Sequence, residues 1–183
     1  MDEQNDIAHM LALLHSLRGT DFVRQLKLIA VRHEFSALST DPQIFTTRGE
    51  RSADYDNLLN AARKAVEHGY KVYVLPNPKG FRTADFIFER KGVFKMYDLK
   101  TVSGSNSLGT RLTESVGQTN RVLLNIRSDY NPIALARHVK KYFETNRDAI
   151  EVLIYKGRKS ISVLREDALS KEFFKYFIAK YIK

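Results

Sequence analysis

Two aspartates and a lysine near the middle of the chain have the spacing of a metal-assisted hydrolytic site. Asp85 lies in the first arm, and Asp98 and Lys100 in the second arm, of the stretch 83–100, TADFIFERKGVFKMYDLK. Both arms are rich in residues that favour strands, and a charged, glycine-containing turn at 91–92 separates them. With a two-residue turn, Asp85 faces Asp98 with Cβ atoms about 5 Å apart, and Lys100 shares their side of the hairpin.

Facing carboxylates repel each other, so the pattern predicts a compensating cation between them. Mg²⁺ prefers oxygen ligands and commonly takes one or two carboxylates from a protein, with water and phosphate completing its shell. Lys100 would then orient an attacking water or stabilise charge on a phosphate. The alternative is that Asp85 and Asp98 are solvent-exposed strand-end residues that Lys100 neutralises, and spacing alone leaves both interpretations open.

The composition favours a polyanionic partner. The chain has 183 residues, enough for one domain with a sizeable core, and carries a formal net charge of +9 with a pI near 9.7. Nucleic acid is the first candidate, and an anionic membrane surface is the alternative, although no apolar run is long enough to span a bilayer. The acidic start is unlike a secretory signal and Cys is absent, so we expect a cytoplasmic protein without disulfides or thiolate metal sites.

Hydrophobic spacing predicts the elements that must position these residues. An N-terminal helical pair (2–18 and 21–38) and a connector (39–52) come first. The next elements are helix 53–68, strand 70–75, the hairpin, helix 107–120 and strand 122–126. This order, helix, three strands, helix, strand, predicts an α/β fold with a mixed central sheet flanked by helices, in which the strand at 122–126 is parallel to its partner.

Beyond residue 127 the pattern predicts a C-terminal extension made of a helix, a β-hairpin and a final helix. The expected ranges are 132–145 for the first helix, 151–155 and 160–164 for the strands, and 166–182 for the last helix. The aromatic side of that last helix is expected to pack in the core or against a second copy of the chain.

The order αβββαβ, with an acid on the second strand and Asp-x-Lys on the third, resembles the PD-(D/E)xK nuclease superfamily. Residues 61–125 look most like the nuclease domain at the C-terminus of contact-dependent growth inhibition toxins of the tRNA-cleaving CdiA type. The segments that carry the resemblance are AVEHGYKVYVLP, RTADFIF, YDLK and SLGTRLTESVGQTNRVLLNI. It implies a restriction-endonuclease-like core over 53–127, in a domain over 46–183 that follows a helical extension over 1–45 and forms one compact unit with it.

The resemblance also implies roles for individual residues. Asp85 matches the first metal-binding Asp of the superfamily, Asp98 its second acid, Lys100 its motif lysine, and Gln118 a helix residue that often completes the catalytic site. Ala84 stands where the superfamily usually has Pro, a mild departure because only the following carboxylate is chemical.

A second departure concerns the first helix of the core, where the superfamily often places a Glu that joins the metal site. Here the candidates are Asp54 and Asp56, and we prefer Asp56 as a further metal ligand.

The expected function is therefore a nuclease that needs Mg²⁺ or Mn²⁺ and hydrolyses phosphodiesters in tRNA or DNA. Phosphate contacts are expected from Lys79, Arg82, Arg111 and Arg121. A toxin of this kind implies a cognate immunity protein and action in the cytoplasm of a target cell, and a homodimer is a further expectation. The alternatives are a catalytically inactive nucleic-acid-binding module of the same fold, and a protein-interaction domain that docks partners through its terminal helices.

Overall fold

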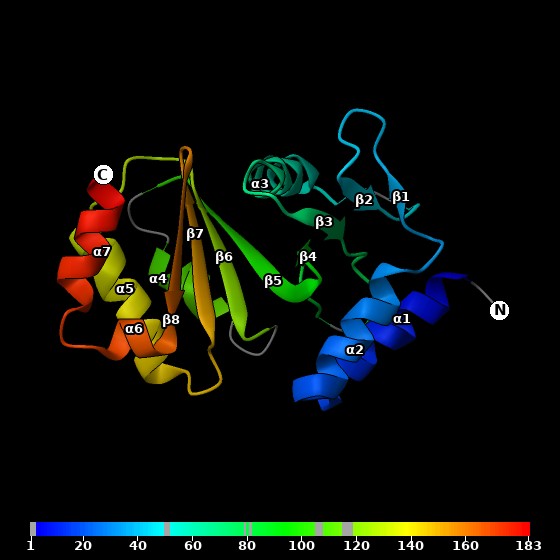
Figure 1. The fold of residues 1–183 in the computed structure, drawn as a ribbon, viewed down its shortest axis with the longest axis horizontal. Coiled ribbons are helices and arrows are strands. Elements are labelled where there is room, and N and C mark those ends of the chain that lie inside the picture. Colours follow the sequence, from blue (N-terminus) through cyan, green and yellow to red (C-terminus); the bar gives the residue numbers. More distant parts are fainter. Residues whose placement is uncertain (1–2, 50–51, 79, 81, 105–107, 115–118) are drawn as a thin grey trace. The chain divides into compact units, whose positions relative to one another are not determined.

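A computed structural model describes residues 3–49, 52–78, 80, 82–104, 108–114 and 119–183 (Figure 1). Two compact units, Met1–Tyr97 and Asp98–Lys183, make up the chain. Strand pairing follows sequence order from β1 to β8, with parallel pairs at β2–β3, β5–β6 and β6–β7 and antiparallel pairs elsewhere. The α/β class, the mixed sheet and the αβββαβ order are thus confirmed.

The first unit contains three helices, a 3-10 turn and four complete strands among its described residues. These are α1 (Glu3–Leu13), η1 (Leu14–Ser16), α2 (Gly19–Ala30), β1 (Ser36–Ala37), β2 (Ile44–Thr46), α3 (Tyr55–Glu67), β3 (Lys71–Val74) and β4 (Phe86–Arg90). Helices α1 and α2 bury Leu11, Leu26 and Ile29 against Ile87 and Met96 of the strands. Helix α3 contacts β2 and β3, and Figure 1 shows it on the other side of β3 from the α1–α2 pair.

The predicted helix over 21–38 was wrong at its end, because α2 stops at Ala30. If the helix continued, its spacing would place His33 on the apolar side. A polar imidazole cannot replace an apolar side chain in the core, and the side chain of His33 is instead 68% exposed. The chain turns there, and Phe35 packs edge-on against Tyr73 with ring centroids 5.5 Å apart. The expected connector also contains β2, whose Ile44 is fully buried and pairs with Val72.

The central hairpin has the predicted register from Phe86 to Arg90, and the facing of Asp85 and Asp98 beyond the paired residues stays a prediction. Arg90 pairs with Val93 and Phe86 with Tyr97 across β4 and β5 (Val93–Val102). The two turn residues have φ values of 52° at Lys91 and 78° at Gly92, which is the left-handed backbone that a two-residue hairpin turn with right-handed strand twist requires. This turn fixes which residues of the two arms face each other.

The second unit holds the C-terminal part of β5 and the elements after it. These are α4 (Leu108–Glu114), β6 (Arg121–Ile126), α5 (Pro132–Thr145), β7 (Glu151–Lys156), β8 (Lys159–Leu164), α6 (Arg165–Leu169) and α7 (Phe173–Ile182). The helices lie on one face of the strands (Figure 1). Their core includes Val102 and Leu124 from the sheet and Leu135, Phe143 and Phe177 from the helices. As predicted, β6 is parallel to β5.

The single final helix expected over 166–182 was wrong, because α6 and α7 are separate. The buried residues Ala168 and Phe173 are five positions apart, which does not fit one face of a continuous helix. The chain breaks at Ser170, which is extended (φ −71°, ψ 154°) and whose Oγ donates to the carbonyl of Asp167 at 2.8 Å. The aromatic side of α7 belongs to the core, as expected.

The domain boundary expected after residue 45 stays a prediction.

Within the described ranges, no helix combines the length and apolar character that crossing a bilayer requires.

Candidate functional site

The centre of the candidate site in the second unit is an ion pair on β5. Lys100 Nζ lies 3.2 Å from Asp98 Oδ2. Because side chains alternate along a strand, both residues point to the same face as Val102, which belongs to the helix-covered core. The pair therefore sits at the edge of the apolar core and not on the outside of the sheet.

Burial distinguishes this pair from an ordinary surface salt bridge. Asp98 is only 2% exposed, and the side chain of Lys100 is 12% exposed. Their register partners on β6 are Val122 and Leu124, both fully buried. A carboxylate in such surroundings requires a compensating cation. The solvent-exposed strand-end interpretation therefore does not hold for Asp98.

Asp85 lies in the first unit, immediately before β4, and is half-buried. Its backbone N–H donates to the carbonyl of Tyr97 at 3.0 Å, and its carbonyl accepts from the N–H of Leu75 at 2.9 Å. Two hydrogen bonds therefore fix its main chain, one toward β3 and one toward β5. Asp85 also directly precedes Phe86, whose register partner Tyr97 directly precedes Asp98.

Three other predicted site residues are exposed. Asp56 lies in the first turn of α3, Arg82 precedes β4, and Arg111 lies on α4. The carbonyl oxygen of Arg82 is 3.1 Å from Nε2 of His15, which ties this segment to the end of the N-terminal helices. Gln118 and Lys79 lie outside the described residues. The structure thus brings together Asp98 and Lys100, and the roles of all the predicted site residues stay predictions.

Arg121, at the start of β6, forms an ion pair with an acid that sequence reasoning missed. Its Nη1 lies 2.5 Å from Oε2 of Glu151, which is 2% exposed, and Ser162 Oγ donates to Glu151 Oε1 at 3.1 Å. The two ion-pair partners are 30 residues apart and meet only through the parallel pairing of β6 and β7. No local sequence pattern signals such a contact.

The candidate metal ligands are carboxylate oxygens. Asp85 and Asp98 supply carboxylate oxygens, the type and number of protein ligands that Mg²⁺ or Mn²⁺ commonly takes beside phosphate and water. The ammonium of Lys100 provides positive charge at Asp98. No group of three or more His, Asp or Glu side chains gathers within the described ranges. The type of donor suits a hard divalent ion, and a metal site formed by these two aspartates stays a prediction.

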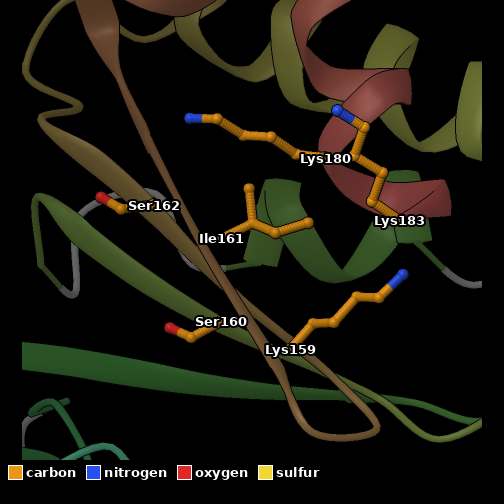
Figure 2. Close-up of a pocket in the computed structure, with 6 residues that line it drawn as sticks. All are labelled: Lys159, Ser160, Ile161, Ser162, Lys180 and Lys183. Carbon is orange, nitrogen blue, oxygen red and sulfur yellow. The ribbon is translucent and has the colours of Figure 1, made fainter.

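A second feature that sequence reasoning missed is a hollow beside β8 and α7. Three of its six lining residues are lysines. The six are Lys159, Ser160, Ile161, Ser162, Lys180 and Lys183 (Figure 2). A usable signal was present, because the segments 156–164 and 173–183 contain six basic residues and no acidic one. An excess of lysine favours an anion-facing surface, although Glu166, Asp167 and Glu172 lie between the two segments.

No protein-family model matches the chain, and no curated protein matches it. Among solved structures, the fold is similar to a chain of the CdiA-CT/CdiI toxin and immunity complex from Burkholderia pseudomallei. The TM-score is 0.51 and the sequence identity 15%, over 66% of this chain and 98% of that chain. At this identity the similarity is one of fold, and it covers nearly all of the neighbour.

Proposed function

We propose that this chain is a metal-dependent nuclease of the PD-(D/E)xK type that acts as a toxin on nucleic acid. The observation that carries the proposal is the buried Asp98–Lys100 pair on β5, one residue beyond the point where β5 binds the main chain of Asp85. A stability role alone is a weak reason for a buried ion pair, because apolar side chains of similar volume stabilise a core at least as well.

In the proposed site Asp85 and Asp98 would hold Mg²⁺ or Mn²⁺, with Asp56 as a further ligand. The chemistry that such an ion supplies is Lewis-acid stabilisation of charge on the phosphodiester and activation of water. Lys100 would bind a phosphate oxygen and orient the attacking water, since its ammonium offers three donors beside Asp98. Gln118 would help to orient that water.

The proposed substrate is tRNA or DNA, bound in part through its phosphates. Lys79, Arg82, Arg111 and Arg121 would make those contacts, and the net charge of +9 supports association with any polyanion. The neighbour in fold belongs to a toxin and immunity complex. We therefore extend the proposal to a cognate immunity protein that would bind this chain.

The test is cleavage of total tRNA, plasmid DNA and single-stranded DNA with Mg²⁺, with Mn²⁺ and with EDTA. Asp98→Asn and Lys100→Met keep the approximate volume of each side chain, and Asp148→Asn is the matched control, because Asp148 is an exposed acid of the same unit. We expect metal-dependent cleavage in the wild type and in the control, and a loss of at least about 100-fold in the two site variants.

Cleavage that persists in both site variants would contradict the proposed site. Salt-dependent binding of all three nucleic acids without any metal-dependent cleavage would instead identify a binding module of the same fold.

A further inference from the structure

The hollow beside β8 and α7 has the chemistry of an anion site, although none of its lining residues belongs to the proposed catalytic group. It has a volume of about 490 Å³, opens to solvent, and is lined by three lysines, two serines and one isoleucine (Figure 2). No acid lines it, although Ser162 Oγ donates to the buried Glu151 at 3.1 Å. Ile161 is buried, while Ser160, Ser162, Lys180 and Lys183 are exposed. The hollow is thus a cationic surface over a small apolar base.

One lysine of this hollow has a structural role, and the side chains of the other two can contact a ligand. Lys159 Nζ donates to the carbonyl of Tyr181 at 2.6 Å, in the last turn of α7. This contact satisfies a carbonyl at the helix end and ties β8 to α7. The side chains of Lys180 and Lys183 make no hydrogen bond or ion pair with any described residue, so their charges are not offset by a direct partner in that part of the chain.

The residues that line this surface carry an excess of positive charge. The segment 156–164, KGRKSISVL, holds three basic residues and no acidic one, and Lys180 and Lys183 add two more at the end of α7, whereas Glu166, Asp167 and Glu172 lie in the segment between. Strand β8 is also the last strand in the pairing order, and β7 is its one partner among the described strands. Alternate backbone N–H groups of an edge strand point away from its partner strand, so they add donors to those of the lysines.

The geometry favours a polymer over a single small anion. In Figure 2 the side chains of Lys159, Lys180 and Lys183 end in different directions around the hollow and do not converge on one point. Separate cations suit successive phosphates of a nucleic-acid strand, whereas a free phosphate would require converging donors.

We infer that the hollow formed by β8 and the end of α7 binds the phosphate backbone of a nucleic-acid strand, as a docking surface additional to the catalytic residues. The inference takes the identity of the polyanion from the proposed function, and it requires no cleavage. Lys180 and Lys183 supply the charge, and Lys159 holds the strand and helix that present them.

The test measures binding in EDTA, so that no cleavage can occur. A fluorescein-labelled single-stranded oligonucleotide of 20 nucleotides is titrated with wild type, with Lys180→Gln/Lys183→Gln, and with Lys171→Gln/Lys175→Gln. The last pair is the matched control, because both residues are exposed, lie in or near α7 and do not line the hollow. Lys159 is left unchanged because of its structural bond, and thermal unfolding checks that both variants fold.

We expect the Lys180→Gln/Lys183→Gln variant to bind at least about fivefold more weakly at about 0.1 M salt. The slope of log affinity against log salt should fall in magnitude by about 1.4, the value for two lost contacts to a single strand. The control pair should change affinity less than about twofold.

Four outcomes would overturn the inference: no oligonucleotide binding by wild type, unchanged binding in the variant, equal weakening in the control pair, or preference for vesicles of anionic lipid over the oligonucleotide. Displacement of the oligonucleotide by millimolar inorganic phosphate at constant ionic strength would also overturn it, because it would indicate a site for one small anion. If no nucleic acid is cleaved with any metal but the variant still loses oligonucleotide binding, the proposed function fails and this inference stands.

Discussion

The ammonium group of Lys100 lies 3.2 Å from Oδ2 of Asp98, two residues earlier on the same strand, and Asp98 is 2% exposed. In water, an ion pair between two side chains on one strand contributes little to stability, because solvent compensates both charges. Here the surrounding core makes the pair interdependent, because neither charge has bulk solvent to compensate it.

Replacing Lys100 alone should therefore destabilise the fold. In Lys100→Met the Asp98 carboxylate loses its ammonium, and we expect the free energy of unfolding to fall by about 3 kcal/mol. The double variant Asp98→Asn/Lys100→Met should recover most of that loss, because no buried charge remains. Urea unfolding at pH 7 measures both values. Equal stabilities of Lys100→Met and wild type would show that the pair is not energetically coupled.

Metal binding should stabilise the folded chain before any substrate is present. A site with a Kd of about 1 mM would gain about 1.4 kcal/mol in 10 mM Mg²⁺, because binding to the native state adds RT ln(1 + [L]/Kd). We expect the thermal midpoint to rise with Mg²⁺ in wild type and in Asp148→Asn. The rise should vanish in Asp85→Asn and Asp98→Asn. A rise of the same size in these two variants would place the ion elsewhere.

Local pattern was enough to predict the central hairpin but not the short strands before it. Alternating residues and a left-handed turn at Lys91 and Gly92 fix the register within one segment. Strand β2, by contrast, has three residues, and Ile44 becomes a strand residue only through pairing with Val72, 28 positions away. The strand propensity of a short segment does not show which distant segment will pair with it.

The same distinction applies to the site. The Asp-x-Lys spacing predicts that Asp98 and Lys100 share a face, but their burial depends on helices that follow later in the chain. The contact between Arg121 and Glu151 depends on the pairing of β6 with β7. The residues of the candidate site could therefore be predicted from the sequence. Their burial and their ion-pair partners could be known only from the tertiary structure.

The Arg32–Glu34 pair in the first unit predicts a specific acid sensitivity. Arg32 Nη2 lies 2.6 Å from Glu34 Oε1 and Nε lies 3.1 Å from Oε2. The hydrogen bonds from this guanidinium lower the pKa of Glu34. A lowered folded-state pKa gives stability that is present above the unfolded value, about 4.3, and is lost as pH falls through the folded one.

Glu34→Gln should consequently be less stable than wild type at pH 7, and the difference should shrink as the pH falls below about 4.5. Urea unfolding across this range measures it, with Glu144→Gln, an exposed acid of the second unit, as the control. A difference that does not change with pH would mean that the charge of Glu34 is not responsible.

The hairpin turn offers a stabilising substitution. Lys91 has φ 52°, a backbone conformation that costs a non-glycine residue roughly 1 kcal/mol and that Asn tolerates better. Lys91→Asn creates the Asn-Gly sequence that such turns favour, and we expect a gain of about 0.5 kcal/mol. Gly92→Ala, at φ 78°, should lose about 1 kcal/mol. Equal stabilities of the three proteins would indicate a turn of another conformation in solution.

Arg121 combines a structural contact with a proposed phosphate contact, and a double substitution separates the two. Arg121→Met leaves the buried Glu151 carboxylate without its cation and should lower the free energy of unfolding by about 3 kcal/mol. Arg121→Met/Glu151→Gln should recover most of that stability.

The guanidinium has five N–H donors, and its side chain is 23% exposed, so donors not used by Glu151 remain for a phosphate. We therefore expect the stable double variant to bind a single-stranded oligonucleotide several-fold more weakly than wild type in EDTA. Its salt dependence should fall by about 0.7, the slope for one lost phosphate contact. Binding equal to wild type would restrict Arg121 to its structural role, because the double variant removes the cation without leaving a buried charge behind.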